Sequence, residues 1–154
     1  MNPEKNSLNR NRDLTGLILR LTIGIIIFPH GAQKVFGWFG GPGFTNEMNY
    51  FTETLHLPWI VALLVIITEF LGGISLIAGF AVRFWSTAMI ILFAGIIYME
   101  HFKNGFFMNW FGNQQGEGYE YHLLVIGISL AILVHGSGRY AIGRFLKFHH
   151  KQSV

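Results

Sequence analysis

The chain has 154 residues, enough for one domain, and 51% of them are hydrophobic, 16% aromatic and only 12% charged. Soluble domains carry about 25% charged residues, so this composition argues against a soluble globule and favours a protein that lies partly in lipid. The absence of cysteine excludes thiolate nucleophiles, iron–sulfur clusters and cysteine-ligated zinc.

Four apolar segments follow one another along the chain, and each is long enough to cross a bilayer, which takes about 20 residues. In chain order they cover residues 14–36, 59–80, 84–102 and 121–140. Together they predict an all-α fold, an integral membrane four-helix bundle. The transmembrane domain covers residues 14–142, between a basic N-terminal tail, residues 1–13, and a basic C-terminal tail, residues 143–154.

The loop between the first two segments is predicted to contain a short helix. Phe44, Met48, Phe51 and Leu55 recur at helical spacing among polar residues. This pattern is typical of an amphipathic helix that lies in the membrane interface. The loop after the third segment is also rich in aromatic residues, so the two loops together can cover a flat apolar ligand.

The positions of the basic residues predict the orientation of the bundle. Only Lys34 and Lys103 lie at the side of the two long loops. The other Lys and Arg residues lie in the tails, early in the first segment, at the end of the fourth or in the hairpin at Arg83. By the positive-inside rule both termini are cytoplasmic, and the basic tails contact anionic lipid rather than nucleic acid. Arg20 interrupts the apolar core that a cleaved signal peptide needs, so we expect this segment in the mature protein.

Polar residues inside the segments define two helix faces. In the first segment one stripe, within about 40° of a single line, is small and basic, which is typical of a face that packs on other helices. It contains Gly16, Arg20, Gly24, Ile27, Gly31 and Lys34. In the second segment Glu69 shares a face with Gly72 and Gly73. Arg20 and Glu69 differ in depth by roughly 7 Å, so we predict that they pair, directly or through water, as a buried ion pair that fixes helix register. Glu69 is equally a candidate proton-relay group.

The outer half of the predicted bundle collects a second group of polar side chains. They are His30, Gln33, Lys34, Glu100, His101, Glu120 and His122. For Glu100 and His101, hydration at the edge of the membrane is a sufficient explanation. We predict a ligand-binding role for His30, Gln33, Lys34 and His122, and a proton-handling role for Glu69 and Glu120.

Two other kinds of site can be weighed against this hypothesis. His30 and His122 are the one histidine pair at a suitable depth to bind a b-type haem between helices, but a lone pair is a weak signal. A zinc site needs three or four ligands, for which His30, His122, Glu120 and Glu69 would all have to converge. We therefore predict no metal site.

Several of these residues resemble a known family. Arg20 followed by the run His30-Gly31-Ala32-Gln33-Lys34-Val35-Phe36 resembles the signature of DoxX-type membrane proteins. Glu69 with Gly72 and Gly73 is similar to the second span of that family, and residues 118–122 are similar to its fourth. The resemblance covers about residues 14–142, although Ala141 and Gly143 stand where the family usually has Ser and Asp.

The resemblance implies a multi-pass, four-helix protein of a bacterial-type inner membrane, from a family often described as oxidoreductases. The DoxD-like relatives of the family are quinone-linked subunits of thiosulfate oxidation, and other members are linked to oxidative-stress complexes. A quinone is therefore the cofactor that the resemblance favours.

Three hypotheses of function follow. In the first, the protein is a redox-linked subunit that binds a quinone-like ligand in the outer half of the bundle: His30 and His122 bond the quinone oxygens, Lys34 stabilises the reduced headgroup, and Glu69 or Glu120 handles protons. Its electrons come from a soluble or membrane redox partner, or from the substrate itself. In the second, it is a non-catalytic membrane scaffold for soluble redox enzymes. In the third, it is a small-molecule or lipid transporter that works as a homo-oligomer.

Overall fold

The computed structural model describes residues 3–143, so the predicted C-terminal tail from residue 144 onward lies outside the described residues. Within this range every element of regular secondary structure is a helix, and there is no strand. The main helices are α1 (Pro3–Phe36), α2 (Gly43–Asn49), α3 (Trp59–Ala78), α4 (Val82–Ile96) and α5 (Glu120–His135). Short helical turns follow three of them: Trp38–Gly40, Tyr50–Thr54, Ile97–His101 and Phe102–Asn104.

Three of the described helical segments are long and apolar enough to cross a membrane. They are Arg10–Phe36, Trp59–Ala78 and Val82–Asn104. The apolar helix α5 has 16 residues, or about 24 Å of length, against a hydrocarbon core of about 30 Å. It ends at His135, before the boundary predicted at Tyr140, because the backbone at Gly136 leaves the helical region with φ 82°. A fourth span stays a prediction.

Besides a buried hydrophobic core, the structure has several fully buried polar side chains and many exposed large apolar ones. Arg20, Ser86 and Ser129 are fully buried, whereas Ile25 and Ile91 are 59% and 68% exposed. Exposed branched aliphatic side chains on long helices fit lipid, and buried polar ones fit the contacts between helices. The tertiary structure therefore supports the membrane environment that the composition indicates.

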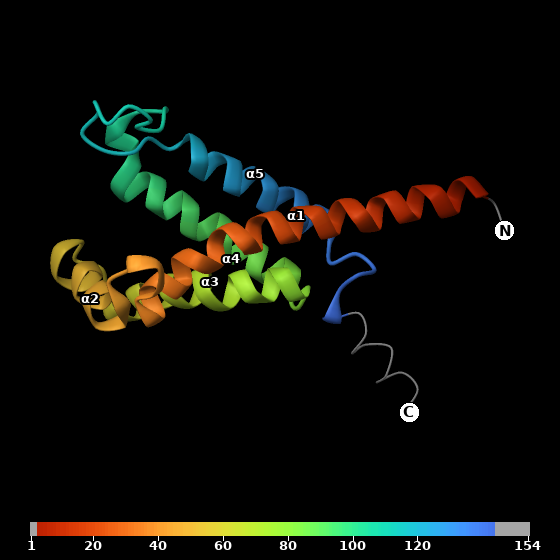
Figure 1. Cartoon of the computed structure of the whole chain (residues 1–154), viewed down its shortest axis with the longest axis horizontal. Coiled ribbons are helices and arrows are strands. Elements are labelled where there is room, and N and C mark those ends of the chain that lie inside the picture. The colour runs from red at the N-terminus through yellow and green to blue at the C-terminus, as the bar shows by residue number, and fades with distance from the viewer. Residues whose placement is uncertain (1–2, 144–154) are drawn as a thin grey trace.

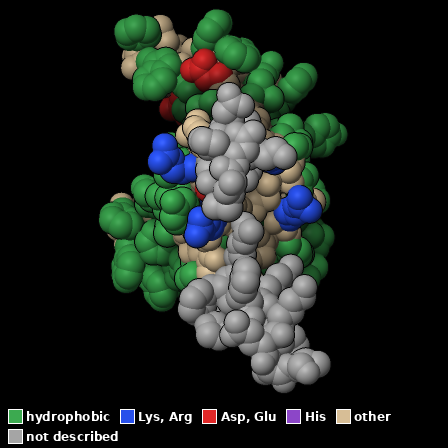
Figure 2. Space-filling view, turned by 90° about the vertical axis from the view of Figure 1, so that its right-hand side faces the viewer, with side chains coloured by type: hydrophobic (Ala, Val, Ile, Leu, Met, Phe, Trp, Pro, Cys, Tyr) green, Lys and Arg blue, Asp and Glu red, His purple; other side chains and the backbone are tan. Residues whose placement is uncertain are grey.

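The helices form two arms that diverge toward one end of the molecule. One arm consists of α1, α2 and α3, the other of α4, α5 and the segment between them (Figure 1). We call the end that carries α2 and residues 105–119 the loop end, and the opposite one, where α1 begins, the terminal end. At the terminal end α1 meets α5, where Gly16 lies against the ring of His135. Figure 2 looks onto the terminal end and shows Lys and Arg side chains there, with hydrophobic side chains on the flanks.

The small face predicted for the first segment is the face on which α1 packs. Gly16, Arg20, Gly24, Ile27 and Gly31 are all buried. A Cβ on Gly24 would lie 2.9 Å from the carbonyl oxygen of Gly73, and a Cβ on Gly31 would lie 2.7 Å from the carbonyl carbon of Glu69. The backbones of α1 and α3 therefore touch along this line, as in other small-residue contacts between membrane helices.

The short helix predicted in the first loop is confirmed as α2, but its apolar face packs on protein. Met48 of α2 and Phe51 of the helical turn after it are buried against Ala62 and Ile66 of α3. The Glu-containing face of α2 is thereby turned toward the end of α1, which matters for the site described below. The first loop is thus packed into the α1–α3 arm, and its position in the membrane interface stays a prediction.

The direct ion pair predicted between Arg20 and Glu69 is not formed, because Glu69 pairs with Lys34. Arg20 donates instead to the carbonyl oxygens of Leu76 at 3.1 Å and Ile77 at 3.4 Å, near the end of α3, and to that of Tyr140 at 2.7 Å. The last carbonyls of a helix have no partner within it and carry partial negative charge, so they attract a cation. Gly79 leaves room for the guanidinium, since a Cβ there would clash with Arg20 Nη1.

Replacement of Gly31 by Ala should separate α1 from α3. The added Cβ would meet the backbone of Phe70 and Glu69, and overpacking of this kind costs about 1–3 kcal/mol. Thermal unfolding in detergent micelles measures the loss. Gly127→Ala is the matched control, because nothing lies within 4 Å of a Cβ at that position and alanine is the better helix former. Equal effects of the two substitutions would contradict the contact.

Replacement of Arg20 by Lys should loosen the terminal end although the charge is kept. A single ammonium group cannot reach the carbonyls of Leu76 and Tyr140 together, and a lost hydrogen bond to a charged group costs about 1.5–3 kcal/mol. The measurement is the free energy of unfolding, with Arg12→Lys as the control because Arg12 lies exposed on the same helix. A stability equal to that of the control would show that Arg20 has no bridging role.

Candidate functional site

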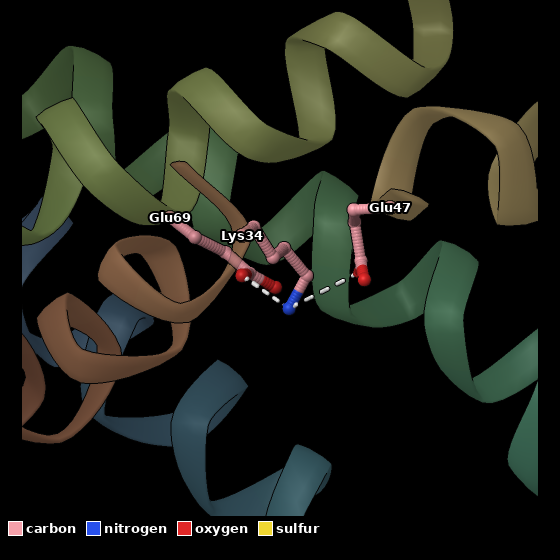
Figure 3. Close-up of polar contacts among 3 residues, drawn as sticks. All are labelled: Lys34, Glu47 and Glu69. Atoms are coloured by element: carbon pink, nitrogen blue, oxygen red, sulfur yellow. Dashed lines mark ion pairs between the residues drawn. The ribbon is translucent and has the colours of Figure 1, made fainter. Parts of the chain in front are cut away.

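One cluster of charges lies inside the α1–α3 arm at the loop end. Lys34, in the last turn of α1, places its Nζ 2.8 Å from Oε2 of Glu69 in α3 and 3.7 Å from Oε1 of Glu47 in α2. Figure 3 shows the ammonium group between the two carboxylates, which reach it from two different helices. We call Lys34, Glu47 and Glu69 the charge cluster.

The local fold explains why these side chains meet. Gly31 brings the backbone of α3 against α1 at Glu69, and Lys34 follows on the same face of α1 one turn later. The glycine-containing turn Gly37–Gly43 then returns the chain, so that α2 approaches the end of α1. Gln33 holds this turn: its backbone carbonyl accepts from Gly37 N at 3.1 Å, and its side chain donates to the Phe39 carbonyl at 3.5 Å.

The three side chains of the charge cluster are buried to different extents. The exposed fraction of the side chain is 6% for Glu69, 13% for Glu47 and 17% for Lys34. Burial raises the pKa of the Glu47 carboxyl; the positive charge of Lys34 opposes this effect and the negative charge of Glu69 adds to it. A buried group of one cation and two carboxylates is unusual, because a single pair would already be neutral.

The second arm contributes polar groups that lack partners. Tyr121, at the start of α5, lies within electrostatic reach of Glu69. Among the described residues, neither the Tyr121 hydroxyl nor Nδ1 of the buried His122 has a hydrogen-bond partner. A buried polar atom without a partner costs about 1–3 kcal/mol, so the two atoms are candidates for hydrogen bonds to a ligand.

Aromatic rings surround these two groups. The ring of Phe93 lies 6.2 Å from that of Tyr121 and 5.6 Å from that of His122, and the rings of His101 and His122 lie 4.2 Å apart. His101 is held from the other side by the backbone carbonyl of Glu117, 2.8 Å from its Nδ1. Aromatic rings of α4, α5 and the turn after α4 therefore lie close to two of the unpaired polar atoms.

Tyr50 stands at the exposed edge of the charge cluster. Burial, and then the negative charges of Glu100 and Glu47, raise the pKa of its phenol. Its side chain is 43% exposed. Glu100, which we expected to be merely hydrated, thus faces a side chain of the other arm.

The structure does not bring His30 and His122 together. His30 is exposed on α1, whereas His122 is buried against Phe93 and His101 in the other arm, and the two arms diverge toward this end (Figure 1). The depth of the two histidines suggested a pair, but depth says nothing about the direction in which a side chain points. Ligation of a b-type haem by this pair is not supported.

Glu120 organises the loop between α4 and α5. Its Oε1 accepts from the backbone of Met108 at 3.0 Å and from Nε1 of Trp110 at 3.3 Å. Glu117 accepts from the backbone of Asn109 at 2.7 Å in the same way. These bonds pair backbone and side-chain N–H groups of a loop without regular secondary structure, and they give Glu120 a structural role. Within residues 3–143, no group of three or more His, Asp or Glu side chains is placed to hold a metal ion.

Sequence reasoning found Lys34 and Glu69 but missed Glu47, Tyr50 and Tyr121. Glu47 was recognised only as a polar residue of the amphipathic helix, since its role depends on how the first loop folds back. Tyr121 carried a usable signal, because it adjoins His122 at the outer start of a predicted span. Nothing in the sequence indicated that Tyr50 would approach Glu100.

Comparison with known proteins agrees with the resemblance seen in the motifs. The sequence profile of the DoxX family matches residues 15–102. The chain belongs to the DoxX family. The match contains Lys34, Glu47 and Glu69, and it ends before α5, so it is shorter than the range expected from the motifs.

Two curated proteins are similar to this DoxX chain over most of its length. "Putative oxidoreductase CatD" of Bacillus subtilis (strain 168) is 28% identical over 125 residues, which are 81% of the chain and 83% of that protein. "Inner membrane protein YqjF" of Escherichia coli (strain K12) is 26% identical over 141 residues, 90% of the chain and 97% of that protein. No solved structure matches. With three apolar helices long enough to span, the chain is a multi-pass protein of the bacterial inner membrane.

Removal of Lys34 alone should destabilise the protein more than removal of the ion pair. Lys34→Met leaves two buried carboxylates facing each other, and the loss of one partner of a buried pair costs about 3–5 kcal/mol. The double variant Lys34→Met, Glu69→Met should regain most of this loss, because the more buried carboxylate is then gone as well and only Glu47, the less buried one, is left. The free energy of unfolding in micelles measures both variants. Lys103→Met, at an exposed position, is the control; a double variant no more stable than Lys34→Met would contradict the pairing.

Proposed function

We propose that this DoxX protein is a redox-linked inner-membrane subunit that binds a quinone-like headgroup at the loop end, between the two arms. One observation carries the proposal: Glu69 of the buried cluster of Lys34, Glu47 and Glu69 lies within electrostatic reach of Tyr121, whose hydroxyl is unpaired, as is Nδ1 of the adjacent His122. The ligand set therefore differs from the one expected from the sequence, since His30 has no part in it.

The proposal includes a topology. α5 acts as a fourth, short span beside α1, α3 and α4, and both termini are cytoplasmic. Exposed Arg10, Arg12, Arg83 and Arg139 belong to the terminal end, which supports a cytoplasmic position for that end by the positive-inside rule. The loop end then faces outward, and the charge cluster lies in the outer half of the membrane.

The residues of the site fit a flat ring with oxygen atoms. Phe93 and the imidazole rings offer stacking surface, while the Tyr121 hydroxyl and His122 offer hydrogen bonds to oxygens. Lys34 offers a positive charge where negative charge develops, and Glu69 and Glu47 can take up or release a proton. A bound quinone would supply the redox chemistry, in which electrons and protons are taken up together.

A partner protein is expected to exchange the electrons. The printed name of the Bacillus subtilis relative describes that protein as an oxidoreductase, which supports the redox class for this chain. The residues of this chain bind and orient the ring, exclude water from it and move protons. The protein is thus the binding and proton-handling subunit, and the electron donor or acceptor is a separate redox protein.

Quinone binding should depend on Tyr121 and not on His30. Titration of the purified protein with decylubiquinone or menadione should quench tryptophan fluorescence saturably. Tyr121→Phe should raise the dissociation constant about tenfold, the value of one hydrogen bond of about 1.4 kcal/mol. His30→Ala, at an exposed position, is the control and should bind as the wild type does.

Two results would contradict the proposal. One is an absence of saturable quenching by either compound with the wild-type protein. The other is an effect of His30→Ala that equals or exceeds the effect of Tyr121→Phe, since the ligand would then lie on the other face of α1.

A further inference from the structure

The charge cluster has an inner and an outer carboxylate. Glu69 is the more buried of the two, with 6% of its side chain exposed against 13% for Glu47. Beyond Glu47 lies Tyr50, which is 43% exposed. Exposure therefore rises step by step from Glu69 toward the loop end, and Glu47 stands between the interior and water.

The charges of the cluster do not balance. With both carboxylates ionised, one ammonium group faces two negative charges in a place that water barely reaches. Uncompensated charge in such surroundings is costly, and a carboxylate pair that shares a site favours one bound proton. One proton on either Glu47 or Glu69 makes the cluster neutral.

Lys34 can serve the two protonation states without a movement of the helices. When the proton is on Glu47, Lys34 pairs with ionised Glu69, which corresponds to the observed distances of 2.8 Å to Glu69 and 3.7 Å to Glu47. When the proton is on Glu69, a rotation of the flexible lysine side chain pairs it with ionised Glu47. The cation always follows the remaining negative charge.

We propose that Glu47 is the proton-exchange residue of the site: the O–H bond of Glu69 breaks, an O–H bond forms on Glu47, and Glu47 then gives the proton to water at the loop end. Lys34 moves from Glu47 to Glu69 in the same step. The net charge of the cluster is unchanged by the transfer, because the proton passes from one carboxylate of the cluster to the other. This inference rests on the proposed function only for the origin of the proton. The shared proton itself exists without any ligand.

The groups that face Glu47 come from each neighbouring element. They are Lys34 of α1, Glu69 of α3, Tyr50 on the turn that follows α2, and Glu100 at the end of α4, which acts through Tyr50. Tyr121 of α5 lies within electrostatic reach of Glu69 from the other arm. Lys34 is the one cation in this set. The pKa of Glu47 is raised, chiefly by burial, which agrees with this placement. A carboxyl group with a raised pKa keeps its proton to a higher pH than an ordinary one, and it loses the proton as the pH rises further.

Labelling with dicyclohexylcarbodiimide tests the shared proton, since this apolar reagent reacts with protonated carboxyl groups. The wild-type protein in micelles, without quinone, should be labelled on both Glu47 and Glu69, as located by peptide mass spectrometry, and labelling should fall as the pH rises. In Glu47→Gln the cluster is already neutral, so labelling of Glu69 should fall by about tenfold, the usual effect of one neighbouring charge on a protonation equilibrium.

Two further variants make the test specific. Glu53→Gln alters an exposed carboxylate on the turn after α2, and it should leave labelling of Glu69 unchanged. Glu47→Asp keeps an acid at the position and should restore it. Unchanged labelling of Glu69 in Glu47→Gln, or a wild-type Glu47 that is not labelled at any pH, would overturn the inference. Because no quinone is present, a wild-type protein that fails to bind quinone but shows this pattern would refute the proposed function and leave the inference standing.

Discussion

The close contact between α1 and α3 is the constraint on which the rest of the structure depends. Gly24, Gly31 and Gly73 keep side chains out from between the two backbones. In lipid, where apolar surface has no drive to leave its surroundings, such close packing and polar contacts hold helices together. The contact at Gly31 also places Glu69 beside the last turn of α1, so that Lys34 can reach it. A wider crossing would leave a carboxylate unpaired in a span, which costs about 2.5–3.5 kcal/mol on insertion scales.

The two cations of α1 that are withdrawn from water are compensated in different ways. Arg20 is bonded by carbonyl oxygens at the end of α3 and by the segment after α5. Carbonyl groups do not exchange protons, so Arg20 has the task of joining three parts of the chain. Lys34 is bonded by two carboxylates, which do exchange protons. The chemistry that we propose therefore belongs to the loop end, while the terminal end is built for stability.

Helical periodicity made much of the fold predictable. The stripe from Gly16 to Lys34 and the face shared by Glu69, Gly72 and Gly73 are properties of one helix at a time, and both faces are turned inward in the structure. Arg20 does not form the direct ion pair with Glu69 that the sequence predicted. That prediction compared only the depths of charged residues, and it left out the backbone carbonyl groups that α3 leaves free at its C-terminal end. Those acceptors are invisible in a list of charged residues, yet they are what the guanidinium binds.

The sequence by itself determined that the chain is helical and membrane-embedded, that one face of α1 is a packing face, and that Lys34 and Glu69 are unusual in their positions. Only the tertiary structure decided that Lys34 is the partner of Glu69, that Glu47 completes the charge cluster, and that His30 and His122 stay apart. The physical reason is that residue spacing sets which side chains share a face of one helix. Which faces then meet depends on the divergence of the two arms and on the way the first loop folds α2 back onto α3.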